Sequence, residues 1–326
     1  MPRTGAAREA NRTTTVLRCD GRPVAGYVYR PRLPAEHAPR PYLHPVRTLG
    51  GVTVTELRPE DHRHHLGAGL AVADVAGFDF WGGRTYVRGR GPTELDNHGT
   101  QRHQGWMLCY PDGFLEELDW VAGGRLLLTE RRTVAVQRLS DDRWALDFTT
   151  ALTNATGEEL SLGSPATNGR AGAGYGGFFW RAPLGDRAPS VFTPHAEGEA
   201  AAHGRTADWL ALSGADWTLV FAGATEETRA DPWFVRAADY PGVGSSLAWD
   251  RPLALPPGET VTRRVVTAVA DGRLSRAEAA RTAAQLTDAP SEAPSAAPSD
   301  TPSEAPSDTP AASTGAARRT GKGAAR

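Results

Sequence analysis

Between residues 13 and 270 the sequence consists of short β-branched or alternating runs that Gly, Pro, Asp and Asn interrupt. Examples are VTVTEL, RLLLTERRTVAVQ, RWALDFTTALTN and ETVTRRVVTAVA. Apolar residues at every second position are typical of strands that bury one face, and frequent turn residues are typical of antiparallel sheets. We therefore predict an all-β fold: a large antiparallel two-sheet β-supersandwich with one short C-terminal helix and a disordered tail.

Composition divides the chain into three parts. Residues 1–12 are polar and are predicted to be a flexible N-terminus, and residues 13–287 form the predicted sandwich domain. Residues 288–326 are rich in Ser, Pro and Ala and have a basic end, a composition that buries too little apolar surface to fold. The predicted helix is LSRAEAARTAAQL, which begins with the capping-box pair Ser275 and Glu278.

The charge pattern bears on the class of partner. The formal net charge is −2 and the arginines are dispersed, so we predict no nucleic-acid partner and no membrane surface.

No run approaches the roughly 18 apolar residues of a membrane span, and the N-terminus lacks the apolar core of a signal peptide, so we expect a cytoplasmic protein. No GxGxxG or Walker-type glycine motif follows a strand, so no nucleotide cofactor is predicted. A small carbohydrate is the partner that we expect.

The densest polar segment is DHRHHLG, at residues 61–67, in a chain with nine histidines. In an extended segment His62 and His64 point to one side and His65 to the other, because side chains alternate along a strand. If the chain turns, His62 and His65 converge, and His103 from a later strand is placed to complete a site. The surrounding region contains six of the nine histidines: His44, His62, His64, His65, His98 and His103.

Acid–base chemistry is one interpretation of this cluster. It needs a group that titrates near neutral pH and a partner that orients it. His65 or His103 is the expected proton donor. Glu56, Asp61 or Glu117 is the expected base, although each of these acids also has many arginines with which to form surface ion pairs. The catalytic candidates are His62, His65, His103, Glu56 and Asp61.

Two other interpretations stay open. Imidazoles and a carboxylate form a known metal ligand set, and His62, His65 and His103 are the candidate ligands for a divalent metal. No zinc signature such as HExxH is present, so no metal is assigned. Alternatively, the histidines form a purely structural hydrogen-bond network.

Aromatic and arginine residues indicate what is bound. FDFWGG and GYGGFFWRAP place aromatic rings beside glycines, where a ring is able to pack against a sugar and glycine lets a ligand approach the backbone. The alternative is that these rings belong to core strands. The candidate substrate-binding residues are His44, Arg47, Trp81, Tyr86, Asn168, Arg170, Trp180 and Arg181.

Several motifs carry a resemblance to a known family. RPYLHPVRT, DHRHHLG, GFDFWGGRTYVRGRG, GGFFWRAP and the late segment that begins PWFVRAADYPGVG together resemble the bacterial PmoA family, often labelled methane oxygenase, over about residues 16–286. The family pattern Asp-His-x-x-His-x-Gly corresponds here to Asp61, His62, His65 and Gly67. Methane monooxygenase subunits are membrane proteins and this chain has no apolar span, so we do not infer that activity.

The resemblance also implies a fold and a function. In overall pattern the family is similar to galactose-mutarotase-like supersandwiches, whose members bind or transform carbohydrates with histidine and carboxylate pairs. We therefore expect a sugar- or glycoside-binding protein that performs acid–base chemistry as an epimerase, lyase or hydrolase. The alternatives are a metal-dependent oxidoreductase or hydrolase that uses the histidine cluster, and a non-catalytic sugar-binding accessory module.

Overall fold

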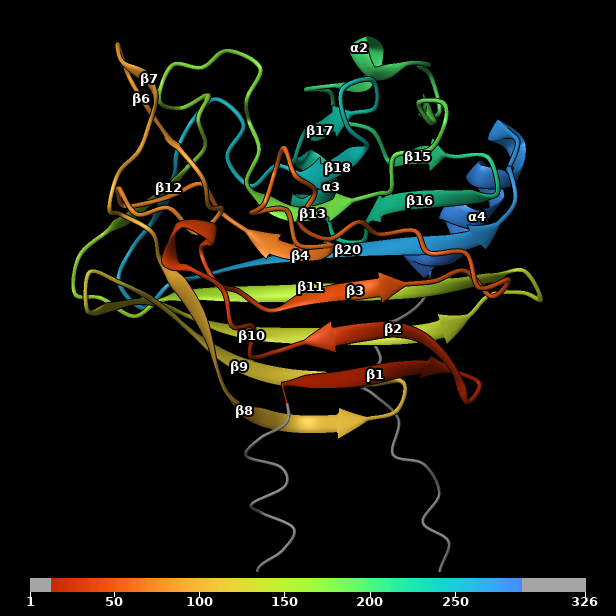
Figure 1. Cartoon of the computed structure of the whole chain (residues 1–326), viewed down its shortest axis with the longest axis horizontal. Helices are drawn as coiled ribbons and strands as arrows, with labels where there is room; N and C mark the ends of the chain where they lie inside the picture. The colour runs from red at the N-terminus through yellow and green to blue at the C-terminus, as the bar shows by residue number, and fades with distance from the viewer. Residues whose placement is uncertain (1–12, 289–326) are drawn as a thin grey trace, which may run out of the picture. The chain divides into compact units, whose positions relative to one another are not determined.

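The computed structural model describes residues 13–288, and most of their regular structure is strand. Two large antiparallel sheets face each other (Figure 1). The seven-stranded sheet has the order β1 (Thr14–Cys19), β2 (Arg22–Val28), β3 (Tyr42–Val46), β4 (Ala68–Ala71), β13 (Gly177–Arg181), β18 (Gly242–Ser245), β17 (Trp233–Arg236). The eight-stranded sheet has the order β14 (Ser190–Phe192), β15 (Trp209–Ser213), β16 (Trp217–Gly223), β20 (Thr260–Asp271), β11 (Arg143–Asn154), β10 (Arg125–Arg138), β9 (Gly113–Ala122), β8 (Thr100–Tyr110).

Smaller elements complete the structure. A three-stranded sheet contains β19 (Leu253–Leu255), β12 (Leu160–Gly163) and β5 (Asp74–Val75), and a hairpin contains β6 (Thr85–Val87) and β7 (Gly91–Thr93). The helices are η1 (Ala35–His37), α2 (Glu199–Ala202), α3 (Glu226–Ala230) and α4 (Arg276–Asp288). The predicted two-sheet all-β fold with a C-terminal helix is confirmed. The predictions for residues 1–12 and 289–326 lie outside the described residues.

The core lies between the two sheets because their strands alternate as the sequence pattern predicts. On β10, Glu130, Arg132 and Val134 are buried, whereas Arg131 between them is exposed. The strands β16 and β20 are also buried on their outer face, because α4 packs there against β15, β16 and β20. No helix within residues 13–288 has the length and apolar character needed to cross a membrane.

The predicted cap of α4 is present. The Ser275 backbone N–H donates to the Glu278 carboxylate at 2.8 Å, and the Glu278 N–H donates to the Ser275 hydroxyl at 3.3 Å. These reciprocal bonds satisfy donors that the first turn of a helix leaves without partners. The capping box therefore fixes the start of the helix that packs on β15, β16 and β20 of the eight-stranded sheet.

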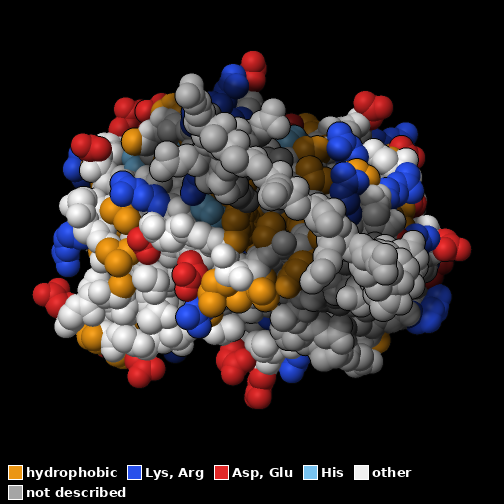
Figure 2. Space-filling view, turned by 90° about the horizontal axis from the view of Figure 1, so that it is seen from below, with side chains coloured by type: hydrophobic (Ala, Val, Ile, Leu, Met, Phe, Trp, Pro, Cys, Tyr) orange, Lys and Arg blue, Asp and Glu red, His pale blue; other side chains and the backbone are white. Residues whose placement is uncertain are grey.

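The edge strands β1 and β8 carry exposed apolar side chains. Val16 on β1 is 45% exposed and Met107 on β8 is 46% exposed. Viewed from the side of these two strands, hydrophobic side chains form a band across the middle of the face, with charged side chains at its margins (Figure 2). One large sheet ends on each side of this band.

The predicted strand VTVTEL is not a continuous strand. The Val54 N–H donates to the Val46 carbonyl of β3 at 2.8 Å, whereas the Glu56 N–H donates to the Arg181 carbonyl of β13 at 2.9 Å. The segment therefore crosses from one strand end to another and forms only isolated bridges. This path carries Glu56 and the histidines that follow it to the outer side of the seven-stranded sheet.

Candidate functional site

The segment Glu56–Gly67 is a loop held by backbone hydrogen bonds at the end of β13. Besides the bond from Glu56 to Arg181, the Arg181 N–H donates to the Gly67 carbonyl at 2.8 Å and the Gly67 N–H donates to the Glu56 carbonyl at 3.0 Å. Gly67 has a φ of +54°, and a Cβ there would clash with the Leu43 carbonyl oxygen. Glycine is therefore required at this position. The base of the loop is fixed independently of the side chains at its tip.

His62 and His65 come together on a turn at the tip of this loop. The His65 N–H donates to the His62 carbonyl at 2.9 Å, and the two rings stack with centroids 4.5 Å apart and planes 25° apart. Tyr240, from the turn before β18, packs on both rings, with centroids 4.8 Å from His62 and 5.3 Å from His65. The three-residue spacing noted in the sequence therefore corresponds to a real pair.

Asp61 orients His62. The His62 Nδ1 atom lies 2.6 Å from Asp61 Oδ2, and the side chains are 31% and 58% exposed. Partial burial raises the pKa of the Asp61 carboxyl, but the hydrogen bond and charge of His62 outweigh this effect and hold that pKa below its ordinary value. With Nδ1 engaged by a carboxylate, Nε2 is the nitrogen left to exchange a proton with a ligand.

His65 is buried and 2% exposed. Its ring packs on Phe179 at 5.2 Å and on Trp81 at 5.9 Å between centroids. Burial lowers the pKa of His65 well below its ordinary value, and the charges of His64 and His62 add to this effect. His65 is therefore neutral near pH 7. Its Nδ1 has no hydrogen-bond partner among residues 13–288.

Arg181 is the last residue of β13 and is 2% exposed. Its Nε donates to Glu56 Oε2 at 3.0 Å, and its Cζ lies 4.6 Å from the centroid of the Tyr240 ring. The Nη1 atom is buried and has no partner within the described part of the chain. Burial raises the pKa of Tyr240, and the nearby charges of Arg236 and Arg181 oppose it. We call His62, His65, Trp81, Phe179, Arg181 and Tyr240 the histidine–aromatic cluster.

Trp81 connects this cluster to a narrow cleft. Its backbone N–H donates to Asp79 Oδ1 at 2.6 Å, which fixes the start of the glycine turn that follows. Its ring lies 4.6 Å from that of Tyr175, and burial raises the pKa of Tyr175 to about 12 while the Arg170 charge opposes the shift. The cleft is lined by Ala73, Asp79, Trp81, Arg84, Thr85, Tyr86, Pro165, Asn168 and Tyr175. Three predicted substrate-binding residues, Trp81, Tyr86 and Asn168, thus share one cleft.

The glycines after Trp81 make room for His64. Gly82 and Gly83 have φ angles of +99° and +81°, and a Cβ on either would lie 2.9 Å from the His64 side chain. Burial and the Arg40 charge lower the pKa of His64 to about 3. We interpreted these glycines as places where a ligand approaches the backbone, but in the structure the side chain that approaches them is His64.

Other predicted residues lie elsewhere. Trp180 is fully buried between the sheets, where its Nε1 donates to the Val54 carbonyl, so it does not face the cluster. Arg47 is exposed, and its backbone holds it in place: the N–H donates to the Val24 carbonyl at 2.8 Å and the carbonyl accepts from Trp144 Nε1 at 2.9 Å. His44 bonds to Thr55 at 3.0 Å beside the base of the loop. Their predicted roles in substrate binding have no support in this geometry.

His103 is not part of the cluster. It faces the interior from β8, and its Nδ1 lies 2.6 Å from Glu116 Oε1, with 3% and 0% of the two side chains exposed. The structure therefore places His103 in a buried pair with Glu116, apart from the loop histidines with which it was expected to act. The ligand set of His62, His65 and His103 is not assembled either. Within residues 13–288 no group of three His, Cys, Asp or Glu side chains is arranged to hold a metal ion.

Sequence reasoning missed Tyr240, whereas Tyr175 was among the aromatic residues of GYGGFFWRAP. Tyr240 lies in ADYPGVG, a turn far from the histidine loop in sequence, and no periodicity marks it. The only available signal was that aromatic residues beside glycines recur in both segments. The contact that joins Tyr240 to Arg181 depends on the pairing of β13 with β18, which the sequence does not specify.

The family of the chain can now be stated. A model of DUF6807, a family of unknown function, matches residues 14–284. The chain belongs to the DUF6807 family. This match corrects the PmoA-family assignment, because the family found is one of unknown function and nothing in the match links it to PmoA.

Other comparisons add little to the DUF6807 assignment. No curated protein sequence matches the chain. A solved structure of a heparinase III is similar with 11% identity over 56% of this chain and a TM-score of 0.24. The chain spans 23% of the length of that protein. A likeness this weak says nothing about the function of the DUF6807 protein.

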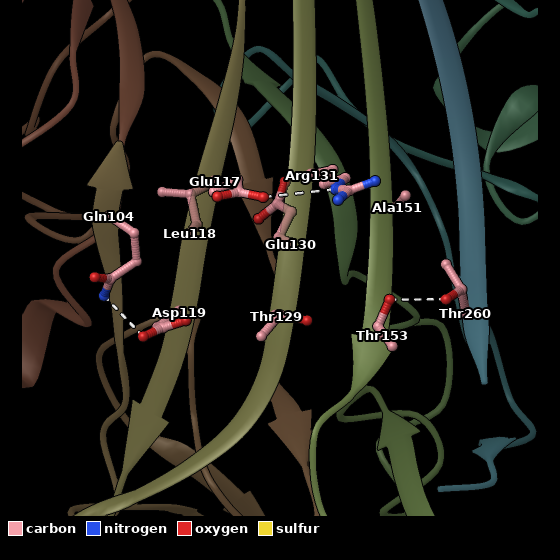
Figure 3. Close-up of a pocket in the computed structure, with 10 residues that line it drawn as sticks. All are labelled: Gln104, Glu117, Leu118, Asp119, Thr129, Glu130, Arg131, Ala151, Thr153 and Thr260. Carbon is pink, nitrogen blue, oxygen red and sulfur yellow. Dashed lines mark hydrogen bonds and ion pairs between the residues drawn. The ribbon is translucent and has the colours of Figure 1, made fainter. Parts of the chain in front are cut away.

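The DUF6807 domain has a second cavity, on the outer face of the eight-stranded sheet (Figure 3). It encloses about 440 Å³ beside strands β8 to β11 and β20. Its polar side chains pair with one another: Gln104 donates to Asp119 at 2.7 Å, and Arg131 lies 3.7 Å from Glu117. Glu117, a candidate base, therefore lies on the outer face of the eight-stranded sheet, where it forms an exposed ion pair with Arg131 and does not act with the histidines. The cluster, with its unpaired buried donors, is the stronger candidate site.

Proposed function

We propose that this protein binds a sugar or glycoside at the histidine–aromatic cluster, and that the Asp61–His62 pair transfers protons to and from it. The observation that carries the proposal is the 2.6 Å contact between His62 Nδ1 and Asp61 Oδ2 on a partly exposed ring. A carboxylate on Nδ1 fixes the ring and stabilises the imidazolium that forms when Nε2 takes a proton.

The surroundings of this pair suit a polyhydroxylated ligand. Tyr240 and His62 offer partly exposed ring faces, against which the C–H face of a sugar packs. The adjoining cleft, lined by Asn168 and Tyr86, has a volume of about 10 Å³, so it accommodates a water molecule and not a sugar ring. Glu56 is a second carboxylate in the site, with 31% of its side chain exposed. Proton transfer of this kind is common to epimerases, lyases and hydrolases.

The proposal changes the roles that the sequence suggested. His65 is neutral and buried, so it holds the ligand and supports the His62 ring rather than exchanging protons with solvent. His103 has no part in the reaction. His62 becomes the proton-transfer group, since it alone among these three is both partly exposed and oriented by an acid.

The test is turnover on a panel of monosaccharides and chromogenic glycosides, with wild-type protein and His62→Ala. We expect the substitution to lower kcat by about 10²- to 10⁴-fold, the usual contribution of a general acid or base. The melting temperature should fall only slightly, because His62 is partly exposed at the tip of the loop. His195→Ala is the matched control, since His195 is exposed on a turn outside the site.

Wild-type turnover in His62→Ala would remove the proposed role of His62. Sugar binding without turnover on any substrate of the panel would support instead a non-catalytic sugar-binding module.

A further inference from the structure

We infer that the ligand of the histidine–aromatic cluster is an acidic sugar, a uronate, whose carboxylate lies between Arg181 and His65. This inference rests on the proposed function, because it names the class of sugar that the same site takes. It starts from two buried side-chain nitrogens, Arg181 Nη1 and His65 Nδ1, that have no hydrogen-bond partner within residues 13–288.

The two donors flank one aromatic ring. Arg181 and His65 are each 2% exposed, and both pack on Tyr240, at 4.6 Å from the Arg181 Cζ and 5.3 Å from the His65 centroid. Arg181 Nη1 and His65 Nδ1 have no hydrogen-bond partner within residues 13–288. More than nine in ten buried polar groups in folded proteins have a partner. Two exceptions beside one ring indicate that a ligand supplies the acceptors.

The chemistry of the donors favours a carboxylate. Arg181 already donates to Glu56 through Nε, and Nη1 donates from a different edge of the planar guanidinium. A neutral imidazole with its proton on Nδ1 supplies the second donor. A carboxylate has two oxygens, one for each donor, and charge-assisted bonds to arginine are about twice as strong as neutral ones. A hydroxyl oxygen also accepts two hydrogen bonds, but it carries no negative charge to match the guanidinium, so its bonds to these groups are weaker.

The surrounding charges limit the ligand to one negative charge. The positive charges of Arg236 and Arg170 act on Tyr240 together with that of Arg181, so three arginines contribute to the electrostatic field at this ring. Glu56 and Asp61 stand in the same cluster, the charge of Asp239 also acts on Tyr240, and these three carboxylates oppose a second negative charge on the ligand. A uronate, with one carboxylate on a sugar ring, fits this balance better than a phosphorylated sugar does.

This placement also suggests what His62 does. The His62 ring stacks on His65, so a carboxylate held by His65 brings the neighbouring carbon, C5 of the uronate, to the side of His62. The C5–H bond breaks, its proton moves to His62 Nε2, and its electron pair forms an enolate that Arg181 stabilises. The electron pair then forms a C4=C5 double bond as the C4–O bond breaks, and the leaving oxygen takes the proton that His62 Nε2 has gained.

The test compares affinities of the wild-type protein for D-glucuronate and D-galacturonate with those for D-glucose and D-galactose, measured by ligand-observed NMR. Each pair differs only in the carboxylate. We expect the uronates to bind at least ten times more tightly. Arg181→Lys, which keeps the charge but lacks Nη1, should lower uronate affinity at least ten times more than it lowers neutral-sugar affinity. Arg131→Lys, on the outer face of the other sheet, is the control and should change neither.

Each outcome decides a separate point. Equal affinity for uronates and neutral sugars overturns the uronate inference and leaves the proposed function standing. Binding of neither kind of sugar overturns both. Displacement of glucuronate by equimolar acetate or sulfate would show an adventitious anion site only, which also overturns the inference. Because the wild-type comparison needs no variant, misfolding of Arg181→Lys would not prevent the decision.

Discussion

Two regions of this protein place a histidine beside an acid, and they differ in how their hydrogen bonds are satisfied. In the histidine–aromatic cluster, His65 and Arg181 keep donors without partners. In the interior, His103 is paired with Glu116, and the Tyr27 hydroxyl donates to the same carboxylate. We call the second region the interior network: Tyr27, Gln101, His103, Glu116, Trp120, Glu130, Arg132 and Thr150.

The polar groups of the interior network form hydrogen bonds with one another. Arg132 donates to Glu130 through Nε and Nη2, both at 2.8 Å, to Tyr27 at 3.1 Å and to Gln101 at 2.9 Å. Tyr27 belongs to the seven-stranded sheet and Arg132 to the eight-stranded sheet, so the network joins the two layers. A buried polar network that satisfies every member fixes the arrangement of a core. A buried cluster in which polar groups lack hydrogen-bond partners is able to bind a ligand through those groups.

Removing the centre of the interior network should have the largest effect on stability. Arg132→Ala leaves Glu130 buried without its main counter-charge, which costs about 3–5 kcal/mol in the free energy of unfolding. Arg131→Ala, one residue away but exposed on the outer face, should cost less than about 0.5 kcal/mol. Denaturant titration of both variants measures the difference. Similar losses in the two variants would mean that the network does not stabilise the core.

A smaller effect should come from the histidines beside the cluster. The folded-state pKa of His64 is about 3, whereas an unfolded histidine has a pKa near 6.5. Between these values the unfolded chain binds the proton and the folded chain does not. The stability linked to neutral His64 is therefore complete above pH 6.5 and is lost as the pH falls toward 3. The slope is at most about 1.4 kcal/mol per pH unit.

The check on this prediction is the free energy of unfolding between pH 4 and 7 for wild-type protein, His64→Gln and His195→Gln. The slope should become shallower in His64→Gln and stay unchanged in His195→Gln, since His195 is exposed. An unaltered slope in His64→Gln would show that His64 is not held in the neutral form.

Much of the fold followed from local patterns, whereas the partners of site residues did not. Alternation predicted β10 and β11, and the three-residue spacing predicted the turn of His62 and His65. In GFFWR, however, all five residues are buried, so the pattern does not tell that Trp180 faces the core and Phe179 the cluster. Periodicity is uninformative where both faces of a strand are covered.

The acid that pairs with His103 illustrates a second limit. We considered Glu117 as a base, but the partner of His103 is Glu116, and Glu117 points to the opposite face. The pairing of β8 with β9 shifts in register between His103 and Gly105, and a shift of one residue exchanges the two faces of a strand. Such a bulge depends on tertiary packing, so the sequence alone does not fix which glutamate is buried.

The most direct test of this account follows the histidine ring signals by NMR while sodium D-glucuronate is added to protein with ¹⁵N-labelled histidine. The chain has nine histidines, and single substitutions assign the signals. The account predicts that the signals of His62 and His65 move with added glucuronate and that those of His103 and His195 do not. Movement at His103 without movement at His62 and His65, or binding that shifts no histidine, would contradict it.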